Sequence, residues 1–313
     1  MYNLKNRKGM GISMKKIIIK VLSAIIIILF LTPVLFTLLH SFMDSYQINS
    51  DKVSVIPQVF NIQQYYKLSV ETNEYFKLYI NSIVITFCII VGQLIVSIAA
   101  AYYFARRKNK FSEIVFLIYI FLMLLPLQLT LIPNVLLYNS IEKYIGIKMF
   151  DTHFAIILPG IFNTIGVFFL KQFFETIPDK LYDMARIDGA NRFQILTRVV
   201  IPYSKNAILA LCLLNFVENW NILEQALIFV NSMSKMPVSI YLNTIYSYQK
   251  EIYYAGSMLF MFPIIYLAYK AKTKIKEWDA DDYKNIKKNN KDICSIFMFF
   301  YSIRLSNANC KRL

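Results

Sequence analysis

Residues 78–105 read LYINSIVITFCIIVGQLIVSIAAAYYFA, residues 106–110 read RRKNK, and residues 114–141 read IVFLIYIFLMLLPLQLTLIPNVLLYNSI. Each long run has 28 residues and contains no charged side chain. A helix needs about 20 mostly apolar residues to cross about 30 Å of hydrocarbon. Both runs are therefore predicted to be transmembrane helices, with the basic cluster between them at the membrane surface.

Four further stretches complete the predicted set of membrane spans. Val21 to Leu39 carries no charge and exceeds the apolar core of a signal peptide, which is about 7–15 residues, so we expect a retained helix. Phe154 to Leu170 gives 17 residues, Ile252 to Tyr269 gives 18, and Asn206 to Val217 gives 12. The last reaches bilayer length only if polar residues are included. The predicted fold is all-α, a polytopic membrane protein with six transmembrane helices.

The composition argues against several classes of soluble enzyme. Hydrophobic residues make up 57% of the chain and charged residues only 17%, whereas soluble domains carry about a quarter charged residues. The chain has two histidines and no GxxxxGK motif, so we expect no acid–base constellation and no nucleotide-binding loop. Neither a disulfide framework nor a metal site is predicted, because the four cysteines are widely spaced: Cys88, Cys212, Cys294 and Cys310.

The basic residues follow the predicted spans. Lys and Arg total 34 against 19 Asp and Glu, and 27 of the 34 fall on one side when the N-terminus is placed in the cytoplasm. This positive-inside bias explains the net charge of +15 without nucleic acid, and it predicts that both termini are cytoplasmic. The predicted order is a cytoplasmic segment (1–20), a first transmembrane helix (21–42), an extracellular loop (43–77), a core with five helices (78–271) and an atypical cytoplasmic tail (272–313).

The predicted cytoplasmic loop between spans four and five contains a distinctive motif, IPDKLYDMARIDGA, at residues 177–190. Pro178 suits the first position of a short helix, and Gly189 suits a left-handed C-terminal cap. Asn191 can cap a second helix, which Pro202 ends. The apolar residues of that second helix recur at helical spacing: Phe193, Leu196, Val199 and Val200. We predict a stiff helix–turn–helix elbow. An amphipathic elbow on the membrane surface and a DNA-reading helix–turn–helix are the alternatives.

This loop resembles the EAA loop of inner-membrane permeases of binding-protein-dependent ATP-binding-cassette (ABC) importers. The family pattern runs approximately E-A-A-x-x-D-G-A and later I-x-x-P. Here Asp183 to Ala190 reads DMARIDGA, and Val199 to Pro202 reads VVIP. Asp183 replaces the usual Glu, and Met184 replaces the first alanine. The resemblance covers about 200 of the 313 residues and points to the carbohydrate branch, to the partner without a large extracellular domain, through Asn81-Ser82, Ala100–Arg107, Leu125-Pro126, Leu131–Pro133, Gly166–Phe174 and Trp220-Asn221.

The resemblance implies a MetI-like permease core in the bacterial plasma membrane, without a cofactor of its own. Its implied partners are a second permease subunit, two ATPase subunits that bind ATP, an extracellular substrate-binding protein and the lipid bilayer. The implied cargo is a sugar, oligosaccharide or glycoside. Import of another small solute, such as an amino acid or polyamine, and a non-transporting scaffold that contacts an ATPase are the alternatives. The ATPase-coupling loop would span 174–204, with Asp183, Ala185, Asp188, Gly189, Ala190 and Pro202 as its coupling residues.

Polar residues in the fifth span are candidates for the transport pathway. At 100° per residue, Asn215, Glu218, Asn219 and Gln225 fall within about 120° of one another, and they are predicted to form one polar stripe. Trp220 could stack on a sugar face. Alternatively, Glu218 and Glu224 lie in water at the outer interface. Polar residues in other spans are predicted to form helix-to-helix hydrogen bonds: Asn81, Gln93, Gln128 and Asn163.

Overall fold

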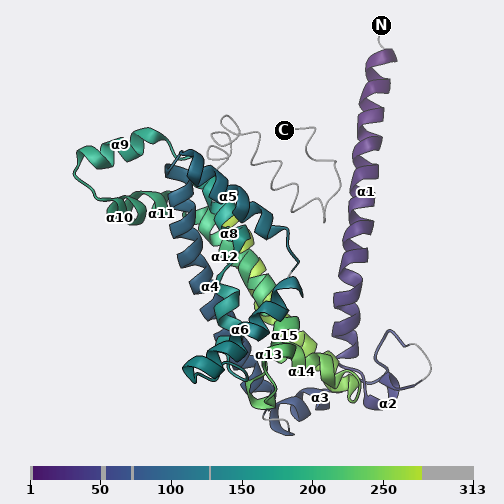
Figure 1. The fold of residues 1–313 in the computed structure, drawn as a ribbon. Helices are drawn as coiled ribbons and strands as arrows, with labels where there is room; N and C mark the ends of the chain where they lie inside the picture. The colour runs from purple at the N-terminus through teal and green to yellow at the C-terminus, as the bar shows by residue number, and fades with distance from the viewer. Residues whose placement is uncertain (1–2, 51–53, 72–73, 127, 277–313) are drawn as a thin grey trace. The chain divides into compact units, whose positions relative to one another are not determined.

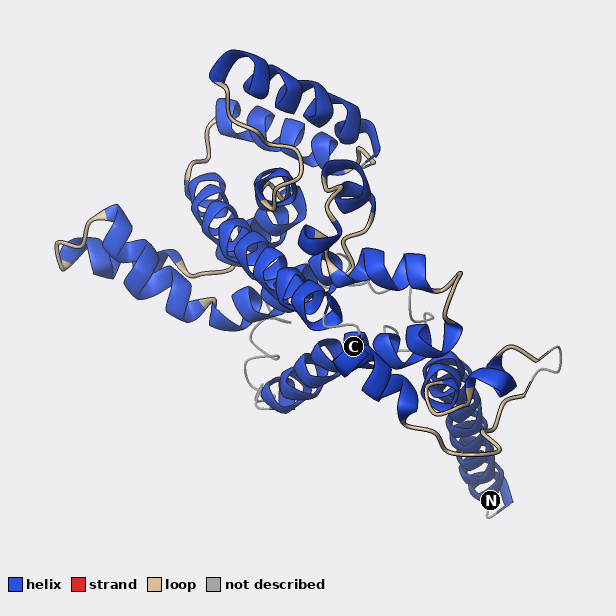
Figure 2. Ribbon diagram, turned by 90° about the horizontal axis from the view of Figure 1, so that it is seen from below, coloured by secondary structure: helices blue, strands red, loops and turns tan. Residues whose placement is uncertain are grey.

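A computed structural model describes residues 3–50, 54–71, 74–126 and 128–276 (Figure 1). Within these ranges every regular element is a helix and no strand occurs, which confirms the predicted all-α class (Figure 2). Residues 277–313 lie outside the described residues, and with them most of the predicted cytoplasmic tail. The described chain ends in α15 (Lys250–Lys276).

Four helical stretches are long and apolar enough to cross a membrane: Ile18–His40, Glu74–Arg106, Phe154–Phe174 and Lys250–Lys270. The number rises to six if each of two bent helix pairs counts as one span. The predicted fifth span corresponds to α12 (Lys205–Trp220), whose 16 residues cover about 24 Å. A membrane protein with several spans is therefore confirmed, and three of the six predicted spans, the third, fourth and fifth, are interrupted or short.

The predicted third span is not one continuous helix. It consists of α5 (Lys110–Met123) and α6 (Gln128–Ile145), which are bent by 101° relative to each other. Pro126 lies in the break, and proline disfavours helical backbone in the residue before it. A run without charges predicts that a segment stays in the membrane, but it does not predict that the segment is straight.

The chain divides into two compact units, and the first comprises Met1–Lys77 with Tyr241–Phe262. Its helices include α1 (Asn3–His40), α2 (Ser45–Ile48), α3 (Gln63–Tyr66) and a π-helical turn at Lys67–Glu71. The Tyr75 hydroxyl donates a hydrogen bond to the Gly256 carbonyl oxygen over 2.7 Å. In the same unit, the His40 ring lies 5.0 Å from the ring of Tyr254. These contacts hold the second half of the unit against the first.

The second unit comprises Leu78–Ile240 with Pro263–Leu313 and contains the elbow. The helices α4 (Glu74–Arg106), α14 (Val238–Ile245) and α15 extend across both units. The others are α5, α6, α7 (Phe154–Ile161), α8 (Thr164–Phe174), α9 (Asp179–Ile187), α10 (Arg192–Ile195), a π-helical turn (Leu196–Val200), α11 (Ile201–Tyr203), α12, α13 (Glu224–Phe229) and a 3-10 turn (Met233–Lys235).

Glycines allow α4 and α7 to pack closely. A Cβ atom added to Gly92 would lie 2.5 Å from Cγ1 of Ile161, and one added to Gly160 would lie 3.0 Å from Cδ1 of Ile89. Small residues at helix crossings let backbones approach each other in membranes, where packing replaces the hydrophobic effect as the driving force. This crossing lies next to the break between α7 and α8, at Phe162 and Asn163.

Two loops that the topology prediction places outside the membrane are tied to each other. The Asp151 carboxylate accepts hydrogen bonds from the backbone and hydroxyl of Ser232, and it lies 3.3 Å from Nζ of Lys235. The Ser232 hydrogen bonds, with support from Lys235, hold the pKa of Asp151 well below its usual range. The loop before α7 and the loop after α13 therefore lie at the same end of this unit, as the alternation of spans requires.

Candidate coupling elbow and transport pathway

The turn of the elbow is closed by a complete Schellman motif. Gly189 has φ +77°, in the left-handed region that the sequence predicted for it. The Ala190 N–H donates to the Ala185 carbonyl oxygen over 3.0 Å, and the Gly189 N–H donates to that of Arg186 over 3.0 Å. These two bonds are the pair that defines the motif. The C-terminal end of α9 is thus fixed through its own backbone.

A reciprocal capping box begins the second half of the elbow. The Asn191 side chain accepts from the Gln194 N–H, and the Gln194 side chain accepts from the Asn191 N–H, each over 2.8 Å. This confirms Asn191 as the cap of a second helical segment. Pro178 is the N-cap of α9 and not its first helical residue, and Pro202 lies within α11, one residue before the end of that helix.

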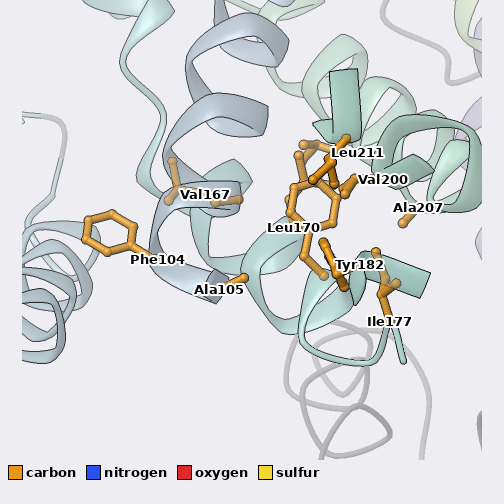
Figure 3. Packing of buried hydrophobic residues seen from close by; sticks show 12 residues of the cluster. Phe104, Ala105, Val167, Leu170, Ile177, Tyr182, Val200, Ala207 and Leu211 are labelled. Carbon is orange, nitrogen blue, oxygen red and sulfur yellow. The ribbon is translucent and has the colours of Figure 1, made fainter. Parts of the chain in front are cut away.

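The elbow is anchored in a buried cluster that joins its two halves to the ends of the membrane helices. Tyr182 of α9 is only 1% exposed, and Val200, from the second half of the elbow, is fully buried. Both belong to the same cluster as residues of α4, α8 and α12: Ala101, Phe104, Ala105, Val167, Leu170, Phe174, Ala207 and Leu211 (Figure 3). A displacement of the elbow is therefore resisted by close-packed contacts with three membrane helices.

The other face of the elbow exposes apolar side chains. Met184 is 62% exposed, Ile187 85% and Phe193 72%. Soluble surfaces rarely gather such residues without a partner, so this face is suited to docking. Leu181, also on α9, packs instead against the buried cluster.

The predicted coupling residues divide into packed and exposed groups. Ala185 and Ala190 are half-buried against the cluster, consistent with the need for small side chains there. Asp183, Asp188, Gly189 and Pro202 are exposed. Oδ1 of Asp183 lies 3.6 Å from Nη1 of Arg186 on the same helix, and Asp188 is the C-cap of α9. The turn at Gly189 is as the sequence predicted, and the roles of these residues in coupling stay a prediction.

Sequence reasoning missed one contact at the elbow. Arg106, the last residue of α4, donates a hydrogen bond to Asp179 over 2.7 Å, and its guanidinium carbon lies 3.7 Å from the centre of the Tyr182 ring. The Arg106 guanidinium holds the pKa of Asp179 below its ordinary value, while burial raises the pKa of Tyr182 to about 12. The basic cluster at 106–110 appeared only as a topology signal because its acidic partner is distant in sequence.

A buried polar network joins α4, α12 and the break between α7 and α8. The Asn219 amide donates to Oε1 of Gln93 over 3.3 Å, and the Gln93 amide donates to the Gly160 carbonyl oxygen over 2.7 Å. Asn163, the N-cap of α8, donates to Oδ1 of Asn215 over 3.3 Å. The predicted helix-to-helix roles of Gln93, Asn163 and Gln128 are confirmed, with Gln128 of α6 donating to Glu224 of α13. Asn81 differs from the prediction, because it donates to the backbone oxygen of Met236 in the loop before α14 and not to another membrane helix.

The predicted polar stripe is not one continuous surface. The prediction extended helical geometry from Asn215 to Gln225, but α12 ends at Trp220 and Gln225 lies on α13. Asn215 and Asn219 are buried in the network, whereas Glu218 is exposed. Trp220 is 1% exposed and stacks on Phe216. Whether any of them contacts cargo stays a prediction. Among the described side chains, Nδ2 of Asn215 and Oε1 of Gln225 are buried without a hydrogen-bond partner.

We predict that Glu218→Gln transports nearly as well as the parent, whereas Glu218→Ala loses at least about tenfold in uptake of a neutral cargo. Glutamine keeps the hydrogen-bonding capacity of the exposed side chain, whereas alanine removes it. A polar group of the cargo that is left unpaired would weaken binding by about 1–3 kcal/mol. Initial rates of uptake into proteoliposomes measure the difference. Equal rates for all three proteins would show that Glu218 lies away from the pathway.

The part of the chain that contains the elbow matches a known protein family. The family described as "Binding-protein-dependent transport system inner membrane component" matches residues 93–270, which include the polar network, the elbow and α12. The match covers more than half of the chain.

Two curated relatives and one solved structure show similarity over most of the chain. The chain is 27% identical over 240 residues to the arabinooligosaccharides transport system permease protein AraQ of Halalkalibacterium halodurans, covering 75% of this chain and 84% of the relative. It is 27% identical over 223 residues to the sn-glycerol-3-phosphate transport system permease protein UgpE of Yersinia pestis, covering 70% and 75%. A chain of a bacterial ABC transporter that imports the acidic polysaccharide alginate has the same fold, with a TM-score of 0.71 at 20% identity over 90% of this chain and 99% of that one.

Proposed function

Because the chain belongs to the family of binding-protein-dependent transport system inner membrane components, we propose that it is one of two permease subunits of an ABC importer for a sugar, oligosaccharide or glycoside. The observation that carries the proposal is the elbow at residues 178–203, which is fixed by its two caps, packed onto three membrane helices and apolar on its outer face.

The proposed mechanism is alternating access. Separate ATPase subunits bind and hydrolyse ATP, and their closure pushes on the exposed face of the elbow. Because the elbow is closely packed against the ends of α4, α8 and α12, the push moves these helices and opens the pathway toward the extracellular side. A binding protein docked there then releases its cargo. In this proposal the chain contributes no covalent chemistry.

The cargo class rests on the relatives. One is named for arabinooligosaccharides, and the structural neighbour is described as importing alginate, so carbohydrate is the proposed class. The relative named for sn-glycerol-3-phosphate favours a phosphorylated polyol as a second candidate. A screen of the cognate binding protein against mono- and oligosaccharides, alginate fragments, sn-glycerol 3-phosphate, amino acids and polyamines distinguishes these classes from the alternatives.

The proposed topology places both termini and the elbow in the cytoplasm, following the 27 basic residues. We predict that a single cysteine at Lys180, an exposed position on α9, is protected from a membrane-impermeant maleimide in intact cells and reacts in inside-out vesicles. Lys235→Cys, in the loop tied to Asp151, should show the opposite pattern. Labelling of the Lys180 cysteine from outside would contradict the proposed orientation.

Photo-crosslinking tests the coupling role directly. A benzoylphenylalanine at Ile187, on the exposed face of α9, should crosslink to an ATPase subunit in membranes, whereas the same group at Tyr144, exposed near the end of α6, should not. Mass spectrometry of the purified, tagged chain should identify that ATPase together with a second permease subunit. Purification without any ATPase, and no crosslink from Ile187, would count against the proposal.

A further inference from the structure

The end of α4 and the elbow helix α9 are connected by more than the buried cluster. Beside the cluster, a recess of about 370 Å³ lies between the end of α4 with the loop that follows it and the first half of α9. It is lined by Ala105, Arg106, Lys108, Asp179 and Asp183. The two helices are therefore not closely packed at this point. Of the residues that line the recess, Arg106 contacts α9 across it, at Asp179 and Tyr182.

Arg106 contacts α9 in two different ways. Its guanidinium donates a hydrogen bond to the Asp179 carboxylate in the first turn of α9 and forms an ion pair with it, over 2.7 Å. The central carbon of the same guanidinium lies over Tyr182, 3.7 Å from the centre of its ring. Arginine is suited to both contacts because its planar group can stack and donate at the same time.

The Tyr182 ring continues this connection into the protein interior. It is 1% exposed and belongs to the buried cluster, and its hydroxyl has no hydrogen-bond partner among the described side chains. The position therefore depends on the aromatic ring and not on the hydroxyl. The ring has Arg106 on one side and the apolar residues of the elbow and membrane helices around it.

We propose that Arg106 is a positioning residue that clamps α9 to the end of α4, so that a push on the elbow displaces α4 together with α9. This inference rests on the proposed function, because the clamp matters for transport only if an ATPase pushes on the elbow. It adds a specific transmission contact outside the family-like loop. The side chain of the adjacent residue, Arg107, donates a hydrogen bond to the hydroxyl of Tyr103, which lies four residues before it on α4.

A pair of spin labels tests the clamp without requiring a known cargo. The labels are placed at Ile95 on α4 and Lys180 on α9, both exposed, in a chain whose four cysteines are replaced by alanine. Distances are measured in the complete complex in lipid nanodiscs, without nucleotide and after trapping with ATP and vanadate. With Arg106 present we expect one narrow distance distribution that is the same in both states.

Arg106→Ala should broaden this distribution at least twofold in width, and Arg106→Lys should give an intermediate width because lysine keeps the ion pair but loses the planar stack. Arg107→Ala is the matched control, since it removes the same charge from the same basic cluster, and Tyr182→Phe keeps the ring; both should match the parent. A narrow distribution in Arg106→Ala, or equal broadening in Arg107→Ala, would overturn the clamp. Arg106→Lys provides the same comparison if the alanine variant does not assemble.

A transport assay distinguishes a failure of this inference from a failure of the proposed function. In proteoliposomes, the number of cargo molecules imported per ATP should fall at least tenfold in Arg106→Ala while ATP hydrolysis stays within about twofold of the parent. If the parent complex imports none of the screened solutes, the proposed function fails, and the label distances still decide the clamp. If the parent imports cargo and Arg106→Ala has an unchanged ratio, the clamp is wrong and the importer remains.

Discussion

Gly189→Val should reduce uptake by a hundredfold or more while the protein is still inserted in the membrane. Gly189 has φ +77°, which costs an L-residue about 1–2 kcal/mol, and a β-branched residue is among the least tolerant. Valine would favour a different backbone at this turn, which breaks the bonds from Gly189 and Ala190 to the end of α9. The two halves of the elbow would then reorient, and a push would be absorbed at the turn.

Two controls separate strain from loss of coupling. Gly146 also has a positive φ, +76°, and a Cβ atom there meets nothing within 4 Å, as at Gly189. Gly146→Val therefore introduces similar strain in a loop at the other end of the unit, and it should transport within about threefold of the parent. Gly189→Asn should also retain most uptake, because asparagine tolerates left-handed backbone. Equal uptake by Gly189→Val and the parent at equal expression would refute the mechanical role of the turn.

Asn219→Leu should have the largest effect on stability. We expect it to lower the free energy of unfolding by about 1–3 kcal/mol, because it leaves a buried polar group unpaired. The Asn219 amide connects α12 to Gln93 of α4, and Gln93 holds the Gly160 carbonyl oxygen before the break in the α7–α8 span. Leucine has the same branching at Cγ but leaves Oε1 of Gln93 without its donor inside the membrane. The complex in detergent should lose its monodisperse elution peak at a lower temperature than the parent.

A double-mutant cycle assigns this loss to the pair. Gln93→Leu with Asn219→Leu should be less destabilising than the sum of the two single variants, because the second substitution removes a group that the first left unpaired. Glu218→Gln, on the exposed side of the same helix, should melt like the parent. Strictly additive effects would show that the two side chains do not depend on each other.

Local features of the elbow were predictable from sequence because they depend on neighbouring residues. Gly189 at a left-handed cap and Asn191 as an N-cap both act within a few positions, so residue type and order are sufficient. The lengths of the charge-free runs similarly predicted membrane helices, because burial in lipid depends on composition over one segment. Gln93 and Asn163 were predicted to bond between helices, since buried amides in a membrane require partners.

Other features depend on the tertiary structure. The end of α12 at Trp220 has no proline or glycine to mark it, so the periodicity that joined Asn215 to Gln225 continued past the real end of the helix. Arg106 and Asp179 are 73 residues apart, and nothing local to either residue predicts that they meet. Leu181 and Met184 are both apolar and occur in the same short helix, but only the packing shows that one is anchored and the other is exposed.

The most direct test of the account is ATP-dependent uptake by the reconstituted complex. The chain is co-purified with its second permease and ATPase subunits and placed in proteoliposomes, and the binding protein with a radiolabelled solute from the screen is added on the side opposite ATP. The account predicts that a carbohydrate accumulates only when both ATP and the binding protein are present. It also predicts that Gly189→Val abolishes accumulation whereas Gly146→Val does not. Accumulation that is independent of ATP, or no accumulation of any screened solute by a complex that hydrolyses ATP, would contradict it.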